Sequence, residues 1–91
     1  MTIKDQDLSK NRELLRNIVS HAVEQANFTI RCLNKRSTVH MLMQCEDTLT
    51  DLLPIVKLIA DADWDYVGVC DQMKNALDAA QVGGEPQLIE L

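Results

Sequence analysis

Three cysteines and two histidines offer the most versatile chemistry, but their spacing argues against a metal site. Zinc sites usually contain close pairs such as C-x2-C or H-x3-H, whereas Cys32, Cys45 and Cys70 are far apart. His40 and Cys45 are five residues apart, which places them about 140° apart around a helix. We therefore expect no metal and no cofactor, with reduced cysteines packed as small apolar side chains. The alternative is a thiol- or metal-responsive regulator that uses His40, Cys45 and Cys70.

Three arginines offer a second possible chemistry, because Arg12, Arg16 and Arg31 could clamp a dianionic substrate in a small helical enzyme. The sequence contains no nucleophile elbow and no glycine-rich phosphate loop. Glu13 and Arg16 are spaced as an ion pair on a solvated helix face. We expect no catalytic residues, and an enzyme with an arginine-lined pocket is kept as a further alternative.

The net charge of −5 is unevenly distributed. Residues 1–36 carry seven Lys and Arg against four Asp and Glu, whereas residues 37–91 carry two Lys against ten acids. The cations are spread along the chain and aromatic residues are few, so direct nucleic-acid binding is disfavoured. The acidic part could instead dock on a basic surface of another protein, or the two parts could attract each other within the fold.

No apolar run approaches the length of about 18 residues that spans a bilayer, so we expect no membrane association. The N-terminal residues are polar and lack the apolar core of a secretory signal. The odd number of widely spaced cysteines does not suggest a disulfide framework. Together these features predict a cytoplasmic protein.

The fold class follows from an aliphatic composition with heptad-like spacing of apolar residues, such as Val19 and then Thr29 or Ile30 in the first helix and Leu49 and Val56 in the second. We predict a single all-α domain over residues 1–91, a three-helix antiparallel bundle completed by dimerisation. The helices are expected at about 8–34, 38–62 and 64–81, with residues 1–6 as a flexible lead and 83–91 as a C-terminal tail. Expected N-caps are Asp7 or Ser9, then Ser37 or Thr38, then Asp63.

Residues 52–60 should form the centre of this bundle, because seven of the nine are aliphatic. A helix that is apolar nearly all round has no face for water, so we expect it to be buried. Pro54 lies within this stretch and removes one backbone hydrogen bond. Since the apolar periodicity continues past it, we expect a kink near Thr50 rather than a helix end.

The sequence leaves the path of the chain open in two segments. Residues 34–38 are polar but hold no Gly or Pro, so they favour a turn without excluding a continuous helix. Gly83, Gly84 and Pro86 indicate a helix stop. The apolar tail after them could fold back onto the bundle or dock on a partner.

The number of aliphatic side chains exceeds what three short helices can bury in one chain. Leu14, Ile18 and Val23 are expected to widen the apolar stripe of the first helix, and Met-rich surfaces adapt to partners. We therefore predict a non-enzymatic interaction module, a homodimer that regulates or inhibits another protein by occluding its surface; the partner and the sign of regulation stay open. The candidate interaction surface consists of Val39, Met41, Met43, Arg12, Arg16, Trp64 and Tyr66.

Overall fold

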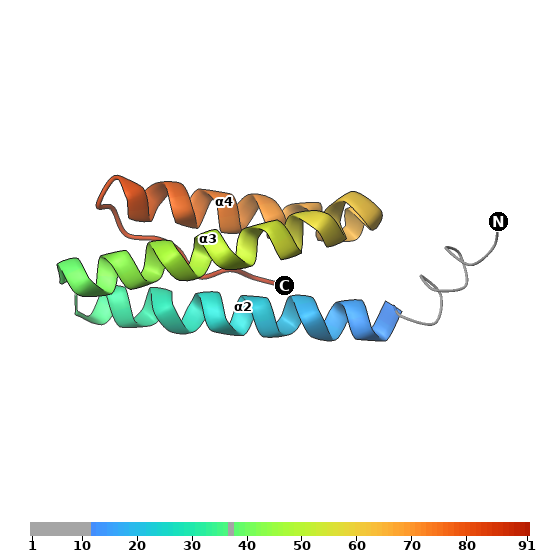
Figure 1. Ribbon diagram of the computed structural model, residues 1–91, viewed down its shortest axis with the longest axis horizontal. Coiled ribbons are helices and arrows are strands. Elements are labelled where there is room, and N and C mark those ends of the chain that lie inside the picture. The colour runs from blue at the N-terminus through green and yellow to red at the C-terminus, as the bar shows by residue number, and fades with distance from the viewer. Residues whose placement is uncertain (1–11, 37) are drawn as a thin grey trace.

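The computed structural model describes residues 12–36 and 38–91. It contains helices α2 (Arg12–Lys35), α3 (Val39–Ala62) and α4 (Val67–Gln81), with a short 3-10 helix η1 (Trp64–Tyr66) before α4. The three long helices pack side by side with alternating direction, and α3 lies between α2 and α4 (Figure 1). This confirms the predicted all-helical three-helix bundle. The predicted lead and the caps Asp7, Ser9 and Ser37 lie outside the described residues.

Hydrogen bonds of short side chains fix the helix starts. The Thr38 hydroxyl accepts a hydrogen bond from the Met41 N–H at 3.1 Å, and Asp63 Oδ1 accepts one from the Asp65 N–H at 3.1 Å. Both residues were predicted as N-caps, where they satisfy amides that have no partner within the helix. A turn therefore separates α2 from α3. The 3-10 start of the last helix was not predicted.

The core is built from the heptad positions of the three long helices. Val19 and Ile30 of α2, Leu49 and Val56 of α3, and Met73 of α4 have no solvent exposure. The predicted spacing of α2 and α3 is thus confirmed for these positions. None of the helices in the described part of the chain combines the length and hydropathy needed to cross a bilayer.

The prediction for residues 52–60 is only half right. This stretch does lie between α2 and α4, and α3 continues through Pro54 without ending. However, Ile55 is 46% exposed and Leu58 is 73% exposed. Two neighbouring helices cover only part of the circumference of α3, so one apolar side stays open to solvent.

A second correction concerns α2. Leu14, Ile18 and Val23 were expected to widen its buried stripe. Val23 is indeed buried, but Leu14 and Ile18 are 53% and 37% exposed. Each precedes a core position, Leu15 or Val19, by one residue, which turns it about 100° away from α3. They therefore lie on the outside of the single chain.

The chain reverses direction after α4 and returns along the bundle (Figure 1). Gly83 has a φ of 74°, a left-handed conformation that glycine adopts without steric cost. The Gly84 N–H donates to the carbonyl oxygen of Ala79 at 2.8 Å, which closes the end of the helix. Pro86 and Ile89 are then buried, so the tail docks on its own bundle.

Candidate protein interface

The α2–α3 pair carries a row of exposed residues beside its core positions. On α2 this row is displaced by one residue from the buried heptad and repeats the same four-three spacing. A four-three spacing keeps residues on one stripe of a helix. We call it the α2 outer row, formed by Leu14, Ile18, His21, Gln25, Phe28 and Cys32.

Helix α3 carries a matching row, displaced by one residue in the same direction from its own buried heptad. Its members follow one another in steps of three or four residues. In an antiparallel pair, equal displacements from the contact stripes lead to the same side of both helices. We call it the α3 outer row, formed by Met41, Gln44, Thr48, Asp51, Ile55 and Leu58.

A hollow of about 680 Å³ shows that the two rows do meet on one side. Its lining includes Gln25, Phe28 and Cys32 from the α2 outer row and Met41 and Thr48 from the α3 outer row, together with other residues of both helices. Because Ile18 lies seven residues before Gln25, and Ile55 seven after Thr48, the rows continue along the same side toward the other end. The two rows together form what we call the α2–α3 face.

This face is apolar at its ends and carries few charges, although Glu24 also lines the α2–α3 hollow beside the α2 outer row. Leu14, Ile18, Ile55 and Leu58 are exposed near one end, and Phe28 is 68% exposed near the other. Asp51 is the single carboxylate in the two rows, and His21 is the single histidine. Exposed apolar groups that share one face are typical of interaction sites.

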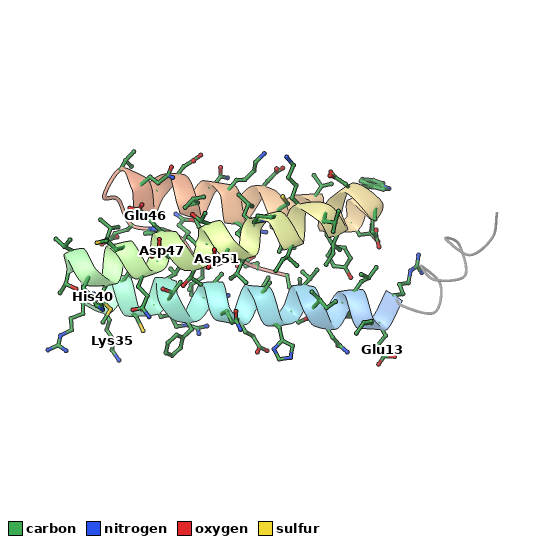
Figure 2. All side chains as sticks on the ribbon, viewed as in Figure 1. Glu13, Lys35, His40, Glu46, Asp47 and Asp51 are labelled. Carbon is green, nitrogen blue, oxygen red and sulfur yellow. The ribbon has the colours of Figure 1, made fainter. Side chains whose placement is uncertain are left out.

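Figure 2 shows how charged residues lie around the bundle, with Lys35 and His40 both near the α2–α3 turn and Glu13 at the opposite end of α2. It also shows Glu46, Asp47 and Asp51 following one another along α3. Asp47 and Asp51 are exposed, and Glu46 is half-buried. The acidic positions on α3 are thus largely available to solvent.

The structure places the seven candidate surface residues in separate regions. Met41 is half-buried and lines the α2–α3 hollow, whereas Val39 and Met43 are exposed outside the two rows. Trp64 is exposed at the start of η1. The structure brings only part of the predicted surface together.

A second hollow of about 700 Å³ lies at the end of the bundle where α2 begins. Arg12, Arg16 and Tyr66 line it, but so do Asp63 and Asp65 as well as Glu13 and Asn17. Arg31 lies about 22 Å farther along α2, since a helix rises 1.5 Å per residue. The three arginines therefore do not form one pocket, and the carboxylates oppose the binding of a dianion.

The soft ligands are also separated. Cys45 and Cys70 are buried, and His40 is exposed. Within residues 12–36 and 38–91, no group of three or more His, Cys, Asp or Glu residues is arranged to hold a metal ion. Burial raises the pKa of the Cys45 thiol; a hydrogen bond with Thr29 opposes that shift, and the Glu46 carboxylate adds to it.

The outer rows were visible in the sequence only as an excess of apolar residues. Leu14 and Ile18 could be seen beside the heptad, but the pattern does not tell which flank another segment covers. Comparison of the chain with models of protein families, with characterised proteins and with solved structures gave no match.

Proposed function

We propose that this protein is a non-enzymatic protein–protein interaction module that associates as a homodimer through the α2–α3 face. The observation that carries the proposal is the pair of nearly uncharged heptad rows on one side of an antiparallel helix pair. Helices that expose a second heptad row pack it against further helices, because this buries the apolar positions. A second copy supplies two such rows with the same spacing.

The distribution of polar residues favours one arrangement of the two copies. Because α2 ends at Lys35 and the antiparallel α3 begins at Val39, residues of the two helices whose numbers sum to about 73 lie at one level along the bundle. By this relation His21 lies at the level of residue 52. His21 and Asp51 thus occupy nearly the same level, midway along their rows.

A two-fold axis parallel to the helices would pack each α2 outer row against the α3 outer row of the other copy. Such an axis leaves each residue at the same height along the bundle, so Leu14 and Ile18 would face Ile55 and Leu58 of the second copy. His21 would then face the Asp51 carboxylate. An axis perpendicular to the helices would instead bring the two Asp51 carboxylates together, which is unfavourable.

Light scattering coupled to size exclusion tests the dimer. We expect a dimer at about 10 μM protein. Leu58→Glu should weaken association about 100-fold or more, because each of the two chains loses one aliphatic side chain that the dimer buries. Val39→Glu is the matched control, since Val39 is also an exposed aliphatic residue of α3 but lies outside the rows. A wild-type monomer at this concentration, or a dimer that only Val39→Glu disrupts, would reject the α2–α3 face.

A charge-swap experiment tests the direction of the axis. His21→Asp should weaken the dimer by placing two carboxylates at one level, and Asp51→Lys added to it should restore the association. The parallel axis predicts this rescue, because the new Asp and Lys face each other across the interface. If His21→Asp weakens the dimer and the double variant is no stronger, the parallel arrangement is wrong.

We further propose that the dimer regulates or occludes a second protein through its acidic outer surface. The exposed carboxylates of α3 and α4 lie outside the two rows, except for Asp51. Asp47, Asp71 and Asp78 are among them, and such a surface complements a basic patch. Replacing these three by Asn should abolish retention of a specific partner in a pull-down from the host, while Glu13→Gln should not; equal retention by both variants would reject this surface.

A further inference from the structure

The C-terminal tail is held like a bound peptide. Residues 85–91 form no helix and run along the bundle with hydrogen bonds to both α2 and α4, and we call the surface of these helices that holds them the tail groove. The Asn27 side chain donates to the Ile89 carbonyl oxygen at 2.9 Å and accepts from the Ile89 N–H at 2.7 Å. The Gln72 side chain makes the same pair of bonds to Glu90, at 2.9 and 2.7 Å.

These hydrogen bonds hold the extended backbone of the tail from two opposite sides. In an extended chain the N–H and C=O groups of successive residues point in opposite directions. Ile89 is therefore bound by α2 and Glu90 by α4, and both amide side chains act as a neighbouring strand would. A third amide, Asn34, donates to the Pro86 carbonyl oxygen at 3.1 Å.

The side-chain requirements of the tail groove are few. Pro86 is fully buried and Ile89 is 3% exposed, whereas Gln87, Leu88, Glu90 and Leu91 are exposed. A proline also restricts the backbone toward the extended conformation that the amides require. The tail groove thus favours a proline followed three residues later by an aliphatic residue, whereas at Glu90 it binds the backbone alone.

We propose that the tail groove is a binding site for an extended segment of another protein with this Pro-x-x-aliphatic pattern, and that residues 85–91 occupy it as an internal competitor. The site is separate from the proposed dimer face, because Asn27 follows the buried Ala26 whereas the α2 outer row precedes it. The Gly83 and Gly84 hydrogen bonds at the end of α4 fold the tail onto its own bundle, which disfavours its exchange with a second copy. Displacement of the tail by a partner would link binding to the release of residues 85–91.

The internal tail competes at a local concentration in the millimolar range, so an external segment gains access when the tail is weakened. The probe is a fluorescent peptide with the sequence of residues 85–91, and the protein is always the full chain. Ile89→Ser should bind this peptide at least about 10-fold more tightly than the wild type, as measured by anisotropy. A peptide with Ser in place of its Ile is the matched control and should not bind.

Two further measurements test whether the tail groove binds the peptide. Adding Gln72→Ala to the Ile89→Ser chain should weaken peptide binding, because it removes one backbone clamp. If Ile89→Ser is folded by circular dichroism and does not bind the peptide at about 1 mM, the proposal is wrong. If Ile89→Ser loses helicity, restoration by the added peptide supports the site, and failure to restore helicity rejects it.

Discussion

The two sides of the α2–α3 pair differ in how far other parts of the same chain cover them. On one side, ten residues after α4 return and bury Pro86 and Ile89 between α2 and α4. On the other side, Leu58 of the α3 outer row and Phe28 of the α2 outer row stay exposed to solvent. A short extended segment can close a groove because side-chain amides satisfy its backbone. Among the described residues no further segment covers the α2–α3 face, which is why we propose that a second copy covers it.

The largest expected effect is on the covered side. Ile89→Ala should lower the free energy of unfolding by about 2–4 kcal/mol, since a buried aliphatic side chain is lost and a cavity remains. Urea denaturation followed by circular dichroism measures this loss. A loss below about 0.5 kcal/mol would show that the tail is not part of the cooperative core.

The amides that clamp the tail come next. Asn27→Ala should cost about 1–3 kcal/mol, because it leaves the Ile89 N–H and carbonyl without partners in a partly buried position. Gln72→Ala is the matched control and should cost less, since its bonds to Glu90 are exposed and water can replace them. Equal losses in urea denaturation would contradict the difference in burial.

The thiols report on access to the open side. Cys32 is half-buried in the lining of the α2–α3 hollow, whereas Cys45 is buried and its raised pKa disfavours the reactive thiolate at pH 8. Iodoacetamide followed by mass spectrometry should therefore modify Cys32 about 10-fold or more faster than Cys45. The dimer should protect Cys32, so Leu58→Glu should speed its modification. Faster modification of Cys45 would contradict its burial.

The smallest effect is expected on the open side of a single chain. Leu58→Ser should change the free energy of unfolding by less than about 0.5 kcal/mol when measured at concentrations where the chain is monomeric. The contrast with Ile89→Ala tests directly whether the two sides differ in burial. A loss as large as that of Ile89→Ala would mean that Leu58 packs within the chain.

Much of the fold could be predicted from the sequence, because helix period and capping are local. The heptads through Val19 and Leu49, the caps at Thr38 and Asp63, and the stop at Gly83 depend on neighbours within a few residues. The candidate site was harder to predict. Leu14 and Ile18 were placed on the buried stripe, since apolar spacing alone does not say how wide a sector the neighbouring helix covers.

The sequence by itself determined three amphipathic helices, the Thr38 cap, the stop at Gly83 and an excess of aliphatic residues, because these follow from the residue type and its position along the chain. Only the tertiary structure decided which of the excess aliphatic side chains are buried. The tail fits beside Asn27 and Gln72 because two helices far apart in sequence present their amides across one groove. Ile55 and Leu58 remain outside because α2 and α4 together cover less than the full circumference of α3.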